Sequence, residues 1–202
     1  MPAAILTQQQ QKVLELLAPI VREQQFYLAG GTALALMLEH RRSVDFDFFI
    51  GQPFEPSTIL NRLPHCEIRQ QTRGTLTVAL DSIQTSFFEY PHPLLEPVNM
   101  TGMVPTAQIA DIAAMKILAI AGRGSRKDFI DLYYIIQRRY SLQQCLSFFT
   151  EKFQTIKIDI YHLMRSLTYF DDAESEIMPE MLIECNWEMI KKFFITEVTK
   201  LQ

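Results

Sequence analysis

The stretch from residue 26 to residue 50 constrains the fold of this chain more than any other. A short apolar run, Phe26–Ala29, stops at Gly30 and Gly31, and because it is too short for a helix we predict a buried strand. Residues 32–39 are mostly Ala, Leu and Met, which predicts a helix directly after the glycines. The sequence DFDFFI (45–50) alternates carboxylates with aromatic rings, as a strand with one buried face does. The expected order is strand, glycine turn, helix, strand.

The remaining pattern divides the chain into an α/β half and a helical half. Apolar spacing predicts a first helix over residues 7–25, with Thr7 as its cap. A short helix over 57–63 and three strands, over 66–72, 75–80 and 85–90, complete a small mixed sheet with flanking helices. Helical periodicity then occupies residues 107–121, 126–139, 142–153, 158–169 and 187–201. We predict an α/β (α+β) core over residues 1–95 and an α-helical half packed against it over residues 96–202, with the boundary among the prolines between residues 91 and 106.

Composition narrows the class of protein. With 202 residues, 48% of them apolar and 21% charged, the chain has enough hydrophobic material for a conventional core. Its net charge of −4 argues against nucleic-acid binding by bulk electrostatics, although basic clusters remain at Arg41–Arg42 and at Arg123–Lys127. Three scattered cysteines suit a reducing compartment, and the N-terminus does not resemble a signal peptide. Because no apolar run approaches the ~20 residues of a membrane span, we expect a cytoplasmic protein without a membrane partner.

The glycine pair and the two aspartates suggest a phosphate and metal site. Glycines at a strand–helix junction bring backbone amides close to a ligand, the helix N-terminus favours an anion, and Thr32 adds a hydroxyl donor. Asp45 and Asp47 leave one face of the predicted strand and repel each other unless a cation lies between them. Magnesium binds such carboxylates together with phosphate oxygens. A glycine pair alone is usually only a tight turn, and D-x-D alone is usually an exposed strand end. Their succession predicts a nucleoside triphosphate (NTP) site with Mg²⁺ (or Mn²⁺).

Two sequence blocks resemble a known family. GGTALALMLEHRRSVDFDFF (30–49) resembles the signature of the polymerase-beta-type nucleotidyltransferase superfamily, and R-x-S before D-x-D narrows the resemblance to the AbiEii/AbiGii-type toxin nucleotidyltransferases. DIAAMKILAIAGRGSRKDFIDLYYI (111–135) resembles the family's helix lysine, basic loop and K-D-x-x-D-L. The resemblance implies metal binding by Asp45 and Asp47, nucleotide contacts, and a catalytic acid–base group. The residues implied are Gly30, Gly31, Thr32, Arg42, Ser43, Lys116 and Arg126 for the nucleotide, and Asp45, Asp47, Lys116 and Asp128 for catalysis.

Several of these assignments have ordinary structural alternatives. A lysine on an apolar helix, such as Lys116, often extends to solvent or pairs with an acidic residue. Asp131 lies three residues after Asp128 and faces a similar way. The two aspartates could pair with Lys116 or Arg126, or one of them could act as the base, for which we favour Asp128. Members of the superfamily generally use a third carboxylate on a later strand. The candidates are Asp81, which has the setting of a turn residue, and Glu89 at the end of TSFFEY, which we choose as the third metal ligand.

The predicted function follows from the resemblance. It implies a metal-dependent enzyme that transfers a nucleoside monophosphate from an NTP to an acceptor hydroxyl. The acceptor would be an RNA such as a tRNA end, or a protein. It also implies the toxin of a toxin–antitoxin pair, with a cognate antitoxin protein as partner. The alternatives are a nucleotide-binding module that has lost catalysis, and a nucleotidyltransferase that modifies small molecules such as antibiotics.

Overall fold

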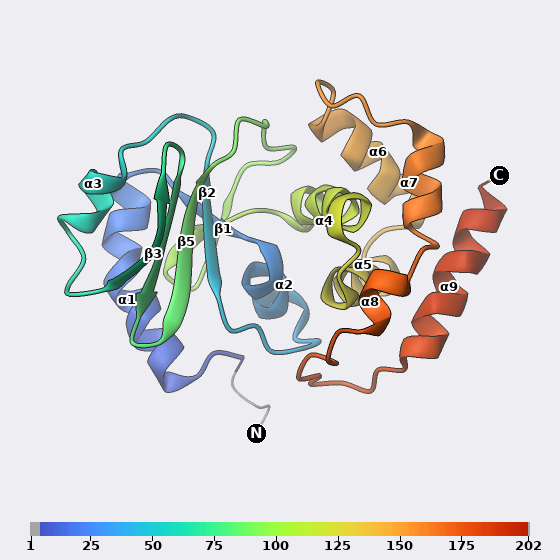
Figure 1. Ribbon diagram of the computed structural model, residues 1–202, viewed down its shortest axis with the longest axis horizontal. Coiled ribbons are helices and arrows are strands. Elements are labelled where there is room, and N and C mark those ends of the chain that lie inside the picture. The colour runs from blue at the N-terminus through green and yellow to red at the C-terminus, as the bar shows by residue number, and fades with distance from the viewer. Residues whose placement is uncertain (1–4, 202) are drawn as a thin grey trace. The chain divides into compact units, whose positions relative to one another are not determined.

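The computed structural model describes residues 5–201 and divides into two compact units (Figure 1). The first unit extends to Gln108 and the second begins at Ile109. Each unit is described by itself below.

The first unit is built on a mixed sheet. Within the described residues, its seven strands follow the order β3-β4-β5-β2-β1-β7-β6. The central strand β2 runs antiparallel to β1 and parallel to β5, while β1 runs parallel to β7. The strands are β1 (Tyr27–Ala29), β2 (Phe46–Ile50), β3 (Glu67–Thr72), β4 (Thr75–Leu80), β5 (Ile83–Glu89), β6 (Asn99–Thr101) and β7 (Val104–Thr106). The two strands that form the candidate site, β1 and β2, are therefore neighbours in the middle of the sheet.

Three helices flank this sheet: α1 (Gln8–Glu23), α2 (Gly30–Leu38) and α3 (Pro56–Leu60). Figure 1 shows α1 and α3 on one face of the sheet and α2 on the other. Thr7 caps α1 through a capping box, in which the Thr7 hydroxyl accepts from the amide of Gln10 and the Gln10 side chain accepts from the amide of Thr7. Helix α2 starts directly from β1, with no side chain capping its first turn.

The alternation predicted for β2 appears in its burial. Phe46 and Phe48 are fully buried, whereas Asp47 and Phe49 between and after them are half-buried. Phe48 stacks on Phe87 of β5, with ring centroids 5.4 Å apart. Phe46 and Phe48 thus face the core, and the opposite side of β2 carries Asp47 and Phe49.

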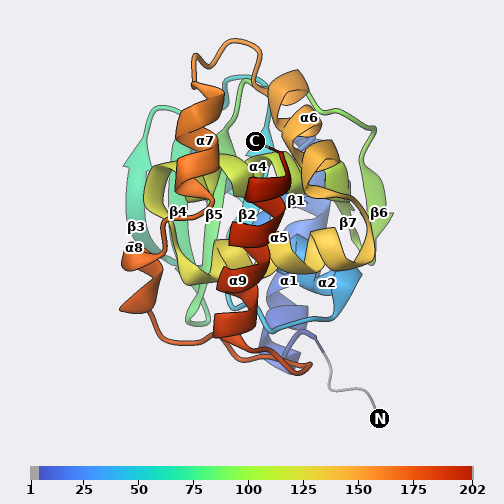
Figure 2. The ribbon, with the colours of Figure 1, turned by 90° about the vertical axis from the view of Figure 1, so that its right-hand side faces the viewer.

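The second unit is a helical assembly. Its helices are α4 (Ile109–Arg123), α5 (Arg126–Arg138), α6 (Leu142–Lys152), α7 (Ile160–Ser166), α8 (Asp171–Glu174) and α9 (Trp187–Lys200). Helix α4 packs against α5, α6 and α7, and α5 also contacts α8 and α9 (Figures 1 and 2). Phe129 of α5 is fully buried, and rings from Phe170, Trp187 and Phe194 surround it. The second unit therefore has its own aromatic core.

The mixed α/β fold class is confirmed, and three elements appear that the sequence did not predict. They are the β6–β7 hairpin and the short helix α8. The hairpin joins the sheet through the amide of Ala107, which donates to the carbonyl of Leu28 over 2.9 Å. The sequence does not predict this hairpin, because each strand has only three residues and Pro105 argues against a strand.

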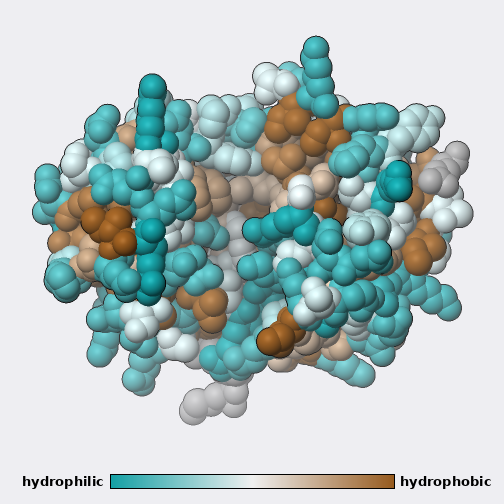
Figure 3. All heavy atoms as spheres, in the orientation of Figure 1, coloured by the Kyte–Doolittle hydropathy of each residue, from teal (hydrophilic) through white to brown (hydrophobic). Residues whose placement is uncertain are grey.

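Three observations concern the exterior. Strand β3 forms one edge of the sheet and is exposed along its whole length. On the face drawn in Figure 3 the surface is mainly hydrophilic, with hydrophobic side chains gathered beside α3 and β3 and, in the second unit, near α4 and α6. Within residues 5–201, no helix is both long and apolar enough to cross a membrane.

Candidate active site

The turn from β1 into α2 lies against the second aspartate of the D-x-D pair. Ala29 is the register partner of Asp47 across the β1–β2 pair. Gly30 has a φ of +70°, and a Cβ atom built on it would lie 3.2 Å from Oδ2 of Asp47. The positive φ disfavours any residue with a side chain, and the approach leaves little room for a methyl group. Gly30 thus allows the start of α2 and the carboxylate of Asp47 to lie side by side.

Gly31 lies against the chain that leads into β2. A Cβ atom at this position would lie 2.6 Å from Nη2 of Arg41 and 3.1 Å from Oγ of Ser43. The nearby guanidinium belongs to Arg41, whereas sequence reasoning had assigned Arg42. The carbonyl of Arg42 accepts a hydrogen bond of 2.9 Å from Nη1 of Arg41. Arginine suits phosphate because its planar donors match phosphate oxygens.

Asp45 is positioned through its backbone. The hydroxyl of Thr32, which is buried, donates to the carbonyl oxygen of Asp45. We had expected this hydroxyl to face the ligand, but the hydrogen bond instead links α2 to the start of β2. Thr32 therefore serves to position Asp45.

Gln10 is a site residue that sequence reasoning did not assign. Its amide Nε2 donates to the carbonyls of Ser43 (2.7 Å) and Val44 (3.2 Å), while its Oε1 accepts from the amide of Thr7. One buried side chain thus caps α1 and holds the segment before Asp45. The Thr-x-x-Gln pattern could have revealed the capping role, but no local signal reveals the bonds to residues 43 and 44.

A divalent cation fits the donors at this turn. Asp45 and Asp47 are both half-buried and flank the buried ring of Phe46. Among residues 5–201, no group of three or more His, Cys, Asp or Glu side chains is arranged to hold a metal. Magnesium does not need such a group, because it commonly uses one or two carboxylates and takes its other ligands from water and substrate phosphates. The donor set therefore suits a metal that is completed by a nucleotide.

The sheet register does not bring Glu89 to this pair. On β5, the partner of Asp47 is Ser86, and Glu89 is the partner of Ile50. Glu89 therefore lies three residues further along the sheet, about 10 Å away, and on the opposite face from Asp47. The turn that contains Asp81 lies at the aspartate end of the sheet, but Asp81 forms no three-residue metal cluster with Asp45 and Asp47. The expectation that Glu89 is a metal ligand loses its support.

In the second unit, Lys116 lies between two buried carboxylates. Its Nζ is 2.7 Å from Oδ1 of Asp128 and 2.6 Å from Oδ2 of Asp131. Both aspartate side chains are fully buried, and that of Lys116 is 7% exposed. Asp128 also binds Arg123, whose Nε and Nη2 each lie 2.8 Å from Oδ2. Lys116, Arg123, Asp128 and Asp131 therefore form one ionic cluster with no formal net charge, here called the Lys116 cluster.

The Lys116 cluster keeps Asp128 ionised. Burial by itself raises the pKa of Asp128, but the positive charges of Lys116 and Arg123 and their hydrogen bonds outweigh burial and lower it. Asp128 therefore carries its negative charge at neutral pH although no part of its side chain is exposed. Lys116 has two carboxylate partners, which is the paired state that a buried lysine needs.

Arg126 is bound within its own unit. Its Nε donates to the carbonyl of Ala173 and its Nη2 to the carbonyl of Glu174, both over 2.9 Å. Its guanidinium also lies over the ring of Trp187, 5.0 Å from the centroid. These contacts join α5 to α8 and α9, and they favour a packing role for Arg126 over the nucleotide contact that we expected.

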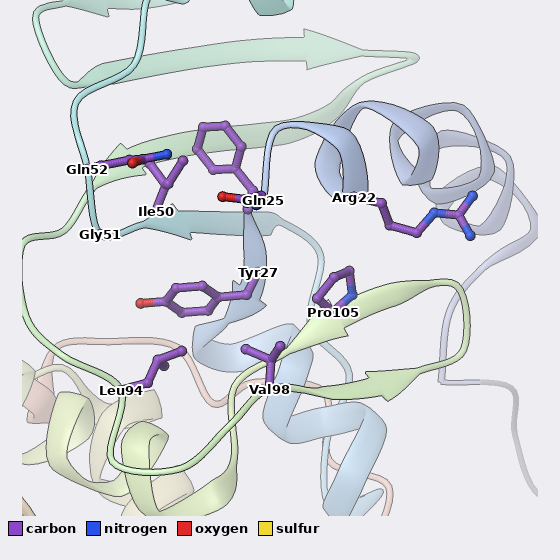
Figure 4. A pocket seen from close by; sticks show the side chains of 10 residues that line it. Arg22, Gln25, Tyr27, Ile50, Gly51, Gln52, Leu94, Val98 and Pro105 are labelled. Carbon is purple, nitrogen blue, oxygen red and sulfur yellow. The ribbon is translucent and has the colours of Figure 1, made fainter.

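A separate cavity lies at the far end of β1 and β2 (Figure 4). It has a volume of about 590 Å³, and Figure 4 shows Tyr27 and Ile50 among the side chains that line it. Tyr27 begins β1 and Ile50 ends β2, whereas Gly30 and Asp47 lie toward the other ends of these antiparallel strands. This cavity is therefore distinct from the glycine–aspartate turn.

Comparison with known families decides the identity of the chain. The model of a family described as "Nucleotidyl transferase AbiEii toxin, Type IV TA system" matches residues 13–75 and 69–200. The chain belongs to the AbiEii nucleotidyltransferase toxin family. It is a nucleotidyltransferase of that family, which confirms the resemblance on which the site prediction rested. An uncharacterized protein of Aquifex aeolicus, aq_aa25, is 38% identical over 201 residues, which cover 96% of each chain.

Solved structures share this fold. MenT4, the nucleotidyltransferase toxin Rv2826c of Mycobacterium tuberculosis, aligns with a TM-score of 0.61 and 15% identity over 95% of this chain and 83% of its own. JHP933 of Helicobacter pylori aligns with a TM-score of 0.56 and 16% identity over 95% of this chain and 89% of its own. At these identities the structures show the shared fold alone and do not assign substrates.

Proposed function

We propose that this AbiEii-family protein transfers a nucleoside monophosphate from an NTP to an acceptor hydroxyl and releases pyrophosphate. In this reaction the acceptor oxygen bonds to the α-phosphorus, the bond from that phosphorus to the bridging oxygen of the β-phosphate breaks, and the hydroxyl proton leaves to a base. Such chemistry depends mainly on positioning and on electrostatic stabilisation of the phosphates. The observation that carries the proposal is the close approach of Gly30 at the start of α2 to the carboxylate of Asp47.

The first unit would bind the triphosphate. The backbone amides at Gly30 and Gly31 begin a helix that no side chain caps, which suits phosphate oxygens. Arg41 and Ser43 lie against Gly31 and add a guanidinium and a hydroxyl. Asp45 and Asp47 would hold Mg²⁺ or Mn²⁺, which when bound supplies positive charge to the phosphates. Thr32 and Gln10 would act indirectly, because they hold the chain on either side of Asp45.

The second unit would supply the acid–base group. Lys116 and Arg123 hold Asp128 ionised, the form that accepts a hydrogen bond or a proton from the acceptor hydroxyl. They also lower its pKa, so Asp128 would orient the hydroxyl more readily than take its proton. Lys116 would keep the two aspartates charged. Asp131 binds the same lysine and would orient it.

The proposed acceptor is an RNA, such as a tRNA end, or a protein, and the proposed biological role is that of a toxin neutralised by a cognate antitoxin. The support is the family itself, whose description names a type IV toxin–antitoxin system.

Isothermal titration of each of the four NTPs, with and without Mg²⁺, tests the proposal. The wild type is compared with the double variant Asp45→Asn, Asp47→Asn. A variant with Glu15→Gln and Glu151→Gln, both exposed, removes the same charge elsewhere. We expect magnesium-dependent binding of at least one NTP by the wild type and the control, and its loss in the aspartate variant. Equal binding by all three proteins would contradict the assignment of Asp45 and Asp47.

A further inference from the structure

A second-unit cavity of about 410 Å³ lies beside the Lys116 cluster. It is formed by the turn between α4 and α5 and by one face of α7 and the residues that follow it. His162, Arg165, Ser166 and Tyr169 line it from that face, since they are separated by the three- and four-residue steps that place side chains on one side of a helix. From the opposite side, Arg123 lines it between two glycines.

Two guanidinium groups line this cavity, in a chain whose net charge is −4. Arg123 and Arg165 both line it and both are exposed, and the acidic side chain among the lining residues is Asp172. The Ser166 hydroxyl donates to the carbonyl of His162. The carboxylates of Asp171 and Asp172 lie close enough to Tyr169 to raise its pKa. The guanidinium groups are therefore the donors that would recognise phosphate, because their N–H groups match its oxygens in pairs.

The backbone of the turn leaves the cavity open. A Cβ atom added at Gly122 would meet no atom within 4 Å. Gly124 has a φ of +57°, which lets the chain reverse between α4 and α5 while Arg123 stays at the rim. A Cβ atom at Gly124 would lie 3.6 Å from Oδ2 of Asp172, so the room for a ligand group beside Arg123 is on the Gly122 side.

Arg123 links the cavity to the proposed acid–base group. Its guanidinium binds the buried Oδ2 of Asp128, yet 59% of its side chain remains exposed. A negatively charged ligand in the cavity would therefore act on the same guanidinium that binds Asp128. The charge of a bound ligand would therefore change the electrostatic environment of the Lys116 cluster through Arg123.

We propose that this cavity, formed by the α4–α5 turn and α7, is a phosphate-binding site. Its ligand would be a phosphate group of either of two sources, the phosphodiester backbone of an RNA or the polyphosphate of a nucleotide. Binding of phosphate in this cavity does not depend on the proposed function. An effect of the bound phosphate on catalysis does depend on it, because that effect requires Asp128 to act on the acceptor.

The test measures binding, not turnover, in the Asp45→Asn, Asp47→Asn background, so that metal-dependent NTP binding at the first unit does not contribute. Two fluorescent probes distinguish the sources: a short single-stranded oligoribonucleotide, and labelled ATP without Mg²⁺. Arg165→Gln is compared with Arg139→Gln, which removes the same charge from an exposed position of the second unit that does not line the cavity.

We expect Arg165→Gln to weaken binding of at least one probe about tenfold, the worth of one charged hydrogen bond. Arg139→Gln should stay within about twofold of its parent. If the ligand is RNA, Arg165→Gln should also reduce the slope of log K against log salt by about 0.7, since one phosphate contact is lost. Equal affinities of the two arginine variants for both probes, or no binding of either probe by the parent, would overturn the proposal. Absence of NTP transfer by the wild type would contradict the proposed function but not the phosphate-binding site, because the test measures binding alone.

Discussion

Gly30 and Asp47 approach so closely across the β1–β2 pair that a methyl group on Gly30 would lie 3.2 Å from Oδ2 of Asp47. The predicted helix start and the predicted metal ligand are therefore parts of one site.

Gly30→Ala should impair both stability and nucleotide binding. A φ of +70° disfavours alanine by about 1–2 kcal/mol, and the new methyl group would press on the Asp47 carboxylate. We expect a lower melting temperature and weaker magnesium-dependent NTP binding. Gly51→Ala is the control, since a Cβ atom there meets nothing within 4 Å. Thermal melting and titration calorimetry measure the two effects, and similar NTP affinities for both variants would argue against the close approach.

Glu89→Gln should leave nucleotide binding nearly unchanged, whereas Asp47→Asn should abolish it. Glu89 pairs in register with Ile50 and lies on the opposite face from Asp47. We expect magnesium-dependent NTP affinity within about twofold of the wild type for Glu89→Gln, because a surface substitution away from the site usually costs under about 0.5 kcal/mol. The measurement is NTP titration at several Mg²⁺ concentrations. A large rise in the Mg²⁺ requirement of Glu89→Gln would restore Glu89 as a ligand.

Gln10→Glu should weaken NTP binding indirectly, by loosening the segment before Asp45. The substitution keeps an acceptor for the Thr7 amide but removes the amide donor to the carbonyls of Ser43 and Val44. We expect a loss of about 1–3 kcal/mol in the free energy of unfolding, together with weaker NTP binding. Gln11→Glu adds the same charge one residue later, at an exposed position, and should have little effect. Chemical unfolding and NTP titration measure the two effects. Equal unfolding free energies and equal NTP affinities of Gln10→Glu and Gln11→Glu would contradict the role of Gln10.

Asp128→Asn should destabilise the second unit in a pH-dependent way. The folded pKa of Asp128 is lowered, so its contribution to stability is present above the unfolded pKa of about 4 and is lost as the pH falls through the folded value. Breaking such a buried pair costs about 3–5 kcal/mol. The difference in unfolding free energy between wild type and variant should therefore be constant near neutral pH and shrink below about pH 4. Urea unfolding at several pH values measures it, and a difference that grows on acidification would contradict this sign.

Local sequence chemistry was sufficient for most of the secondary structure. Thr7 and Gln10 form the capping box that starts α1, and the alternation of Asp and Phe in residues 45–48 reappears as alternating burial along β2. Gly30 and Gly31 mark the junction of β1 and α2 as predicted. The interactions that form these features join residues only a few positions apart, so the local sequence is sufficient to predict them.

The tertiary structure alone decided which distant residues meet. Asp47 pairs with Ser86 and not with a carboxylate because β2 and β5 are parallel in one particular register, and no local pattern specifies a register between strands so far apart. Lys116 binds both Asp128 and Asp131 because α4 packs against α5, and Arg126 binds α8 because α5 packs against α8. The sequence by itself determined the helix caps, the glycine turn and the acidic strand, whose causes are short-range. Strand pairing and helix packing join segments that are far apart in the sequence, and they determined which of those residues lie next to one another.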